Sequence, residues 1–246
     1  MSTVLAPAKL TWYLEIVGRR SDGYHELRSE MVTLDFADLL AIDDAGDYLR
    51  FDPPNPELEA DETNLVTRAL HLVQRRAGVH VTKVIPTGGG LGGGSADAAA
   101  ILRWAGGVSS QVALGLGADV PFCQLGGRAL VEGVGELLTP LAFELRRVTL
   151  FMPGFSVSTS DCFAAFDEIE GSTVARNHLE HAAGLVEPRV RRALSWLRAE
   201  FSPDVELAGS GSTMFLEGHV REGQTSWDVP GPDGTIRIRQ ALTSPR

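Results

Sequence analysis

The sequence predicts an α+β fold with mostly antiparallel sheets and flanking helices, arranged in two lobes. Three observations support this fold class. Segments rich in β-branched and aromatic residues alternate apolar and polar side chains along much of the chain, as strands do. Amphipathic helical patterns at residues 64–77 and 189–201 separate groups of these segments. The 246 residues contain no internal repeat or long linker, and this length fits one large domain or two small ones built into each other.

The order of the elements follows from local patterns and turn residues. Gly78 is expected to end the first long helix. The predicted elements are, in chain order, strands at 10–17 and 26–34, a hairpin-and-loop region at 44–56, a helix at 64–77, a strand at 79–85, a short helix at 95–104, strands at 126–140 and 148–152, a helix at 189–201, and a strand, glycine turn and strand at 205–217. We expect two domains, at residues 1–145 and 146–246.

Composition narrows the class of protein. The 22 Lys and Arg against 32 Asp and Glu give a net charge of −10, which disfavours a nucleic-acid partner. No stretch approaches the roughly 18 apolar residues of a membrane span, and no signal peptide is evident, so we expect no membrane partner and a cytoplasmic location. Cys123 and Cys162 form no CxxC pair and are expected to be buried free thiols. Monomer and homodimer both stay open.

The segment PTGGGLGGGSADAA, at residues 86–99, is the strongest functional signal. Six of the nine residues from Pro86 to Gly94 are glycine, which lets the backbone approach a ligand closely and turn successive N–H groups toward an anion. The helix expected next adds unpaired N–H groups and the positive end of its dipole. Ser95 is placed either to cap that helix or to bind a magnesium ion. The sequence therefore predicts a phosphate site.

A flexible linker is the alternative interpretation of this glycine loop. Linkers usually mix glycine with serine and threonine, and they do not lie between a strand and a helix. The loop also lacks the Lys-Ser or Lys-Thr of a P-loop, and no acidic residue marks a second strand as in dinucleotide-binding units. Phosphate binding is the favoured interpretation, although neither of the common nucleotide motifs explains it.

PTGGGLGGGSADAA resembles the central ATP motif of the GHMP kinases, the superfamily of galactokinase, homoserine, mevalonate and phosphomevalonate kinases. Other segments narrow the resemblance to the 4-diphosphocytidyl-2-C-methyl-D-erythritol kinase family. They are APAKLTWYLEIVGRRSDGYHEL (6–27), LGADVPFCQLGGRALVEGVGELLTPL (116–141), PGFSVSTSDCF (153–163) and LAGSGSTMFLE (207–217). The resemblance implies a GHMP-kinase-like two-lobed fold, ATP and Mg²⁺ as cofactors, and a cytidyl-linked sugar alcohol as the substrate.

The resemblance also implies roles for individual residues. Lys9, in Ala-Pro-Ala-Lys, matches the catalytic lysine, and Asp119, in Gly-Ala-Asp-Val-Pro, matches the catalytic aspartate. Tyr24 and His25 match the cytidine-binding pair, and Phe163 matches an aromatic that closes the other face of the cytosine. Two loops complete the implied site: the glycine turn at 209–212, and the ATP loop of Pro86, Thr87, Gly88, Gly89, Gly90, Leu91, Gly92, Gly93, Gly94, Ser95 and Ala96.

The chemistry of these residue types supports the implied roles. Transfer of a γ-phosphoryl group to an alcohol needs positioning and charge stabilisation more than covalent chemistry. Asp119 is suited to accept the hydroxyl proton, and Lys9 to keep Asp119 ionised and to neutralise charge on the phosphoryl group. Stacking between Tyr24 and Phe163, with a directional bond from His25, would select a cytosine. The implied reaction is phosphorylation of the 2-hydroxyl of 4-diphosphocytidyl-2-C-methyl-D-erythritol in non-mevalonate isoprenoid precursor biosynthesis.

Plainer interpretations exist for the same residues. An early lysine is usually a solvated charge, Asp119 is placed to cap a helix, and Tyr24 and Phe163 are common types of core aromatic. The sequence also departs from the family in two places: Thr11 stands where the family usually carries a substrate-side Asn, and the segment at 104–115 is short. Two alternative functions therefore stay open, a GHMP kinase for another small alcohol and a catalytically silent nucleotide-binding homologue.

Overall fold

The computed structural model describes residues 1–54, 58, 60–169 and 176–245. Its strands are β1 (Ser2–Arg19), β2 (His25–Asp43), β3 (Tyr48–Asp52), β4 (Gly78–Thr82), β5 (Arg128–Gly133), β6 (Leu137–Pro140), β7 (Arg147–Met152), β8 (Glu206–Leu207), β9 (Met214–Glu217), β10 (Ser226–Gly231) and β11 (Gly234–Ser244). Its helices are α1 (Leu65–Leu72), α2 (Gly93–Trp104), α3 (Ser110–Leu114), α4 (Val120–Leu125), α5 (Thr159–Asp167), α6 (Glu180–Val186) and α7 (Pro188–Glu200).

The strands join into one 11-stranded sheet with the neighbour order β3-β4-β2-β11-β7-β9-β8. Off this path, β1 and β5 pair with β2, β6 pairs with β5, and β10 pairs with β11. Among these named strands every pair is antiparallel except β3 beside β4. The predicted α+β class with mostly antiparallel sheets is therefore confirmed.

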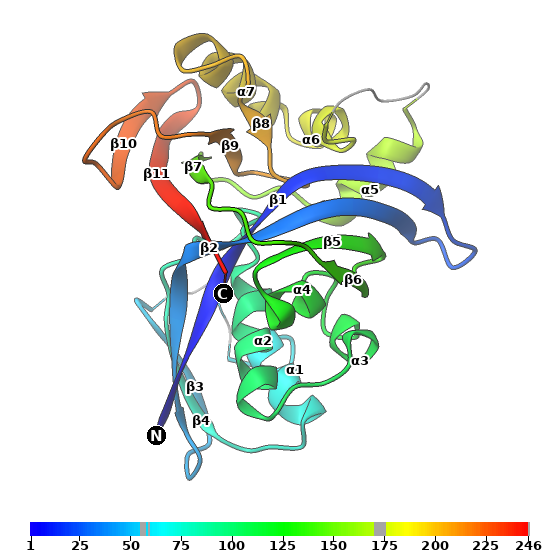
Figure 1. Cartoon of the computed structure of the whole chain (residues 1–246), viewed down its shortest axis with the longest axis vertical. Helices are drawn as coiled ribbons and strands as arrows, with labels where there is room; N and C mark the ends of the chain where they lie inside the picture. The colour runs from blue at the N-terminus through cyan, green and yellow to red at the C-terminus, as the bar shows by residue number, and fades with distance from the viewer. Residues whose placement is uncertain (55–57, 59, 170–175, 246) are drawn as a thin grey trace.

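Strands β1 and β2 form a long antiparallel arch that reaches both lobes (Figure 1). Their register runs from Ser2 opposite Ile42 to Arg19 opposite His25. Both strands are longer than the predicted segments at 10–17 and 26–34, because pairing with each other and with β4 and β5 extends them past their most apolar parts. This arch places the first residues of the chain opposite the last residues of β2.

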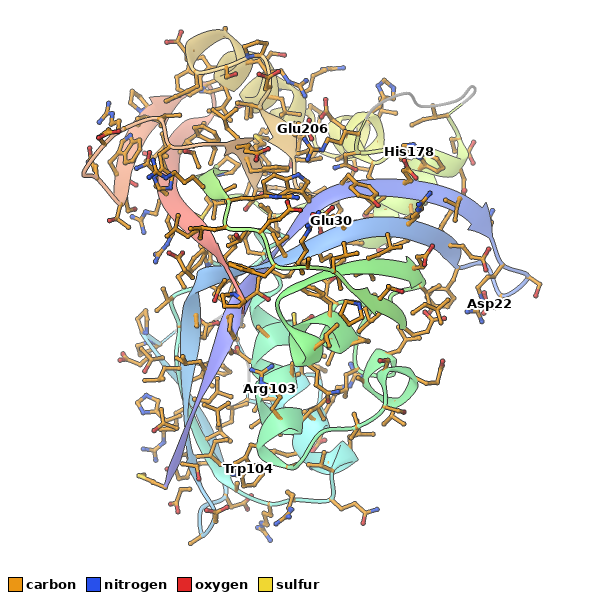
Figure 2. All side chains as sticks on the ribbon, viewed as in Figure 1. Asp22, Glu30, Arg103, Trp104, His178 and Glu206 are labelled. Atoms are coloured by element: carbon orange, nitrogen blue, oxygen red, sulfur yellow. The ribbon has the colours of Figure 1, made fainter. Side chains whose placement is uncertain are left out.

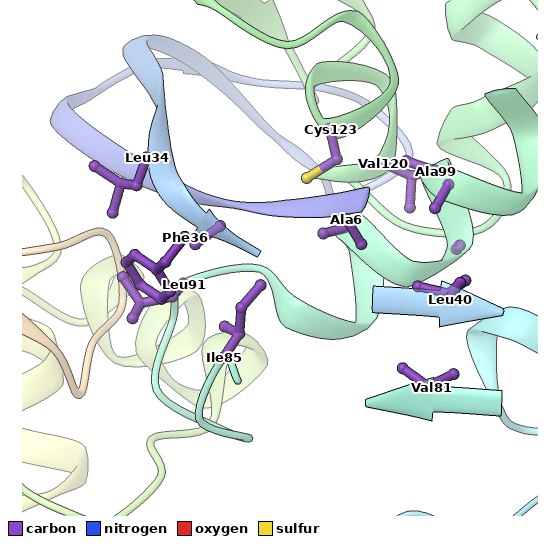
Figure 3. Packing of buried hydrophobic residues seen from close by; sticks show 14 of the residues in the cluster. Ala6, Leu34, Phe36, Leu40, Val81, Ile85, Leu91, Ala99, Val120 and Cys123 are labelled. Atoms are coloured by element: carbon purple, nitrogen blue, oxygen red, sulfur yellow. The ribbon is translucent and has the colours of Figure 1, made fainter. Parts of the chain in front are cut away.

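Two large hydrophobic clusters lie mainly in one lobe each, and the first also includes residues of β7, β9 and β11. The first joins β1, β2 and β4 to α1 and α2, and Figure 3 shows Ala6 and Leu40 within it. The second gathers apolar residues of α5, α6 and α7 against β7, β9 and β11. In β7, Leu150 belongs to the first cluster and Phe151 to the second, since successive side chains of a strand face opposite ways. We propose a domain boundary at residue 145, just before β7.

Helix α1 ends earlier than the predicted helix at 64–77. Asn64 caps its start, its Oδ1 accepting from Val66 N at 2.9 Å, but the helix stops at Leu72. Gly78 does not end this helix; it begins β4, where a Cβ would lie 2.3 Å from the ring of Tyr48 in the neighbouring β3. Close pairing of two strands, and not a helix end, therefore explains this glycine.

The predicted elements of the C-terminal lobe lie where expected. Helix α7 occupies the predicted segment at 189–201, and β8 and β9 flank the predicted glycine turn. The polar chain end after residue 217, for which no element was predicted, forms β10 and β11. Two residues of the predicted hairpin-and-loop region, 55 and 56, lie outside the described residues, and the rest of that region contains β3. No helix of the described residues is both long and apolar enough to cross a membrane.

Candidate active site

A cleft of about 630 Å³ lies along the glycine loop. The start of α2 and the residues around the start of α1 form its walls. Its lining changes from apolar side chains at Phe51, Leu58 and Leu65 to the backbone of Gly88–Gly94, and it includes the carboxylate-bearing Asp119. A cleft with an apolar part and a glycine-lined part fits a ligand with a flat ring and an anionic chain.

The glycine loop is closely enclosed at two positions. Gly90 has a φ of +77°, and a Cβ there would lie 2.5 Å from the carbonyl oxygen of Gly211. Gly92 has a φ of +71°, and a Cβ there would lie 2.7 Å from Cγ of Lys9. Both positions therefore need glycine, for backbone conformation and for space.

Backbone hydrogen bonds fix the loop to both lobes. Lys9 N donates to Leu91 O at 3.0 Å, and Thr213 N donates to Gly89 O at 3.1 Å. Leu91 itself is fully buried. The loop is thus held between β1 and the turn before β9, so its free N–H groups keep a defined direction.

Helix α2 continues the loop into the core. It begins at Gly93, with Gly92 as the N-cap residue, so the prediction that Ser95 caps it is wrong. Ser95 is instead the third residue of the helix and lines the cleft. Ala98, Ala99 and Ala100 are fully buried, because their small side chains let the helix pack closely on its neighbours. The first turn of α2 thereby points its unpaired N–H groups toward the cleft.

Lys9 and Asp119 meet beside this cleft. Lys9 Nζ lies 3.0 Å from Asp119 Oδ2 and donates to Thr11 Oγ1 at 3.2 Å. Lys9 and Thr11 are two residues apart on β1, so both side chains leave the same face of the strand. The Lys9 side chain is 7% exposed and that of Asp119 is 30% exposed, so the ion pair is buried on the lysine side and open to the cleft on the aspartate side.

Asp119 occupies the N-cap position of α4, with Pro121 in the first turn, as the plainer interpretation expects. Its side chain, however, makes no capping hydrogen bond and contacts Lys9 instead. Because α4 packs beside α2, the carboxylate is carried to the glycine-loop cleft. The capping interpretation is therefore right about the backbone position of Asp119 and wrong about the contact of its side chain.

His25 and Phe163 meet at the far end of the β1–β2 arch. Their ring centroids are 4.9 Å apart with an interplanar angle of 19°. His25 Nε2 lies 2.7 Å from Asp167 Oδ1, on the last residue of α5. Tyr24 is 66% exposed, and among the described residues its ring stacks on no other aromatic ring. The structure thus brings together two of the three predicted cytosine-binding residues, with Tyr24 beside them in sequence.

The glycine turn at 209–212 connects these two groups. A Cβ at Gly209 would lie 3.4 Å from Thr11 Oγ1, next to Lys9. Ser210 Oγ lies 2.8 Å from Thr159 Oγ1, at the start of the helix that carries Phe163. The predicted site residues therefore form one connected chain of contacts from the glycine loop to α5.

Comparison with known proteins agrees with this arrangement. Residues 64–127, which include the glycine loop and Asp119, match the family described as GHMP kinases N terminal domain. A curated 4-diphosphocytidyl-2-C-methyl-D-erythritol kinase of Azoarcus sp. is 36% identical over 237 residues, covering 86% of this chain and 83% of that protein. The enzyme of the same name from Delftia acidovorans is 37% identical over 246 residues, covering 86% and 85%.

The chain belongs to the 4-diphosphocytidyl-2-C-methyl-D-erythritol kinase family. A crystal structure of a 4-(cytidine 5'-diphospho)-2C-methyl-D-erythritol kinase matches it with a TM-score of 0.73 and 30% identity, covering 99% of each chain. The mevalonate kinase of L. major matches with a TM-score of 0.66 at 13% identity, covering 100% of this chain and 96% of that one, and shows a shared fold alone. The predicted GHMP-kinase-like fold is confirmed by these comparisons.

The sequence did not predict a cluster of buried charged side chains beside the glycine-loop cleft. Lys83 Nζ lies 2.7 Å from Asp97 Oδ2 and also bonds Asp38, whose Oδ1 accepts from Ile85 N at 2.8 Å. Burial raises the pKa of Asp97 to about 7, although Lys83 works against this. Burial lowers the pKa of Lys83, but Asp97 and Asp38 more than offset this, so the net shift is upward. The available signal in the sequence was Lys83, three residues before the loop, and an Asp inside PTGGGLGGGSADAA.

Proposed function

We propose that this chain is an ATP-dependent kinase that phosphorylates the 2-hydroxyl of 4-diphosphocytidyl-2-C-methyl-D-erythritol, a step in non-mevalonate isoprenoid precursor biosynthesis. The observation that carries the proposal is the Lys9–Asp119 ion pair, 3.0 Å long, beside the glycine-loop cleft. A base and a cation next to a phosphate cradle are what transfer to an alcohol needs. Family membership and curated relatives of that name support the substrate.

In the proposed reaction Asp119 takes the proton of the attacking hydroxyl as general base. Its partly exposed carboxylate faces the cleft, where an alcohol has access to it. Lys9 holds the Asp119 carboxylate by the ion pair and neutralises charge that develops on the transferring phosphoryl group. Thr11 accepts a hydrogen bond from Lys9 Nζ at 3.2 Å, so it orients the ammonium group. Thr11 therefore acts on the lysine as well as lying on the substrate side.

The cleft fits ATP on structural grounds. The tight enclosure of Gly90 and Gly92 leaves a side-chain-free wall, and the first turn of α2 presents unpaired N–H groups that would hold phosphates. MgATP supplies the phosphoryl group and neutralises part of its charge. Magnesium bound through phosphates needs only one or two protein ligands, and we propose the half-buried Ser95 hydroxyl as one.

Tyr24, His25 and Phe163 are the proposed cytosine site. The rings of His25 and Phe163 stack on each other, and Tyr24 is exposed directly before β2. Both observations support the binding of a flat ring at this end of the arch. The net charge of −10 disfavours nucleic acid as a further partner. We propose a monomer or homodimer that acts in the cytoplasm, because that compartment supplies ATP.

The test is ADP release with 4-diphosphocytidyl-2-C-methyl-D-erythritol as acceptor. We expect turnover by the natural chain and a 10²- to 10⁴-fold lower kcat for Asp119→Asn, roughly the effect of losing a general base, with ATP affinity kept. Asp44→Asn, at an exposed turn after β2, removes the same charge away from the cleft and should leave kcat unchanged.

Two outcomes would contradict the proposal. ADP release only with a different small alcohol, unaffected by changing Tyr24 or His25, would favour another GHMP kinase activity. ATP binding without turnover of any acceptor, and no further loss on Asp119→Asn, would favour a catalytically silent homologue.

A further inference from the structure

Asp167, the last residue of α5, has no part in the function proposed above. Its Oδ1 lies 2.7 Å from His25 Nε2, and its Oδ2 lies 3.2 Å from Arg19 Nη1. The His25 side chain is 7% exposed, whereas that of Asp167 is 26% exposed. Asp167 therefore links a nearly buried imidazole to an exposed guanidinium at the end of the arch.

Helix α5 encloses the His25 ring with three of its side chains. Phe163 stacks on the ring at a centroid distance of 4.9 Å, and Phe166 meets it edge-on at 6.2 Å and 87°. Phe166 and Asp167 lie three and four residues after Phe163, so all three lie on the same side of the helix. The ring plane is set by the two phenylalanines, and the direction of Nε2 is set by the carboxylate.

The Asp167 contact decides which ring nitrogen carries the proton. A carboxylate only accepts hydrogen bonds, so Nε2 must carry a hydrogen to make this bond. In a neutral imidazole the other nitrogen, Nδ1, then has a lone pair and accepts. Within the part of the chain that the structure describes, the ring nitrogens of His25 make no other hydrogen bond, which leaves Nδ1 available to a ligand.

We infer that Asp167 is a positioning residue for base selection: by holding the proton on Nε2, it makes His25 Nδ1 an acceptor for the exocyclic amino group of cytosine. The inference rests on the proposed function, in which His25 meets a cytidyl group. Uracil carries a carbonyl oxygen where cytosine carries that amino group. An acceptor at Nδ1 therefore binds cytosine and disfavours uracil, whose oxygen would face a second lone pair.

The Arg19 contact does not explain Asp167 equally well. The Arg19 side chain is 58% exposed, and exposed ion pairs contribute little. The His25 contact is the more enclosed of the two. Arg19→Gln separates the two roles, because it removes the ion pair and leaves the bond to His25.

The first experiment compares binding of CDP and UDP by calorimetry, which needs no turnover. We expect the natural chain to prefer CDP, and Asp167→Ala to bind CDP about tenfold more weakly with UDP affinity unchanged or improved. Arg19→Gln and the adjacent charge-loss control Glu168→Gln should keep the natural ratio. An unchanged CDP-to-UDP ratio in Asp167→Ala would overturn the inference, as would a natural chain that binds the two equally.

The second experiment reads the tautomer of His25 directly by ¹⁵N NMR at pH 8.5, with His25→Gln to assign the signals. We expect the proton on Nε2 in the natural chain and a mixture of tautomers in Asp167→Ala. A natural chain with the proton on Nδ1, or a variant with no change, would contradict the inference. Asp167→Asn provides a second variant if Asp167→Ala does not fold, because its amide is able to donate to Nε2 and would shift the proton to Nδ1.

These readouts separate the two proposals. A chain that releases no ADP but shows the expected tautomer and CDP preference would remove the kinase function and leave base selection standing. If the natural chain turns over the cytidyl substrate, but Asp167→Ala changes neither the base preference nor the KM for that substrate, the kinase function stands and the base-selection role of Asp167 fails. In active Asp167→Ala we expect KM for the cytidyl substrate to rise about tenfold, with kcat and the KM for ATP unchanged.

Discussion

The two ends of the candidate site are built in different ways. At the glycine-loop end, Lys9, Asp119 and the loop itself all come from the first lobe, and Lys9 is 6% exposed. At the cytosine end, His25 belongs to β2 and Phe163 to α5, so the pair joins two lobes, and Tyr24 is 66% exposed. The catalytic pair and the loop thus belong to one lobe, with the loop also bonded to the turn before β9, whereas base recognition depends on how α5 lies against the arch.

The surroundings of the arch reinforce this difference. Beside β1, residues 176–178 follow the strand, with Ile16 N donating to His178 Nδ1 at 3.0 Å and Leu14 bridging Asn177. Figure 2 shows His178 next to the arch on the side of α5, while Arg103 of α2 reaches back to the first part of β1. The cytosine end therefore gains its support from second-lobe segments. Four predictions, from Lys9→Met to Tyr24→Ala, test the roles assigned to the two ends and to the loop and helix between them.

Lys9→Met should have the largest effect, on chemistry alone. It removes the cation that neutralises the phosphoryl group and keeps most of the apolar stem that packs on Gly92. We expect kcat to fall about 10²- to 10³-fold, as for loss of one preorganised charge donor. CDP affinity, measured by calorimetry, should stay within about twofold because the cytosine end is separate. A kcat within threefold of the natural value would contradict the assigned role.

Gly92→Ala should destabilise the glycine loop, whereas Gly94→Ala should not destabilise the protein. At Gly92 the new Cβ would lie 2.7 Å from Lys9 Cγ at a φ of +71°, while at Gly94 the nearest contact is 3.6 Å, to Leu65 Cδ1. We expect the free energy of unfolding to fall by about 1–3 kcal/mol for Gly92→Ala and to rise by up to about 1 kcal/mol for Gly94→Ala. Urea titration measures both, and equal effects would show that the loop is not enclosed.

Asp97 should make stability depend on pH in an unusual direction. Its folded-state pKa is about 7 because of burial, well above the ordinary value of 3.8 for an aspartate. Between about pH 4 and pH 7 the folded state therefore binds more protons than the unfolded state, and stability falls as pH rises, by at most about 1.4 kcal/mol per pH unit. Asp97→Asn should flatten this slope. Urea unfolding at pH 5 and pH 7 measures this change in stability. An equal change in the natural chain and in Asp97→Asn would contradict the prediction.

Tyr24→Ala should have the smallest effect on the fold. Its ring is largely exposed, so the free energy of unfolding should change by less than about 0.5 kcal/mol. The KM for the cytidyl substrate should rise about tenfold through lost stacking, with kcat unchanged. Phe143→Ala, at another exposed aromatic that is 45% exposed, is the control and should leave KM unchanged. An unchanged KM in Tyr24→Ala would remove Tyr24 from the cytosine site.

The sequence by itself determined the fold class, the glycine loop and the family. Each is carried by residues that are contiguous in the chain, so local patterns contain the whole signal. The end of α1 shows where this stops: the helical pattern continues to 77, but pairing of Gly78 with Tyr48 required a strand to start there. The N-cap prediction for Ser95 failed similarly, because two preceding glycines already adopt the helical conformation.

Only the tertiary structure decided which charges meet. Asp119 has the sequence position of a helix cap, yet packing of α4 beside α2 turns it to Lys9, which lies 110 residues earlier. Asp38 lies in β2, Lys83 just after β4 and Asp97 in α2, and Asp167 reaches His25 across 142 positions. Such pairs produce no periodic pattern in the sequence, since the apolar and polar pattern of a strand or helix does not indicate which residue of another element it contacts. Their geometry follows from how the two cores pack.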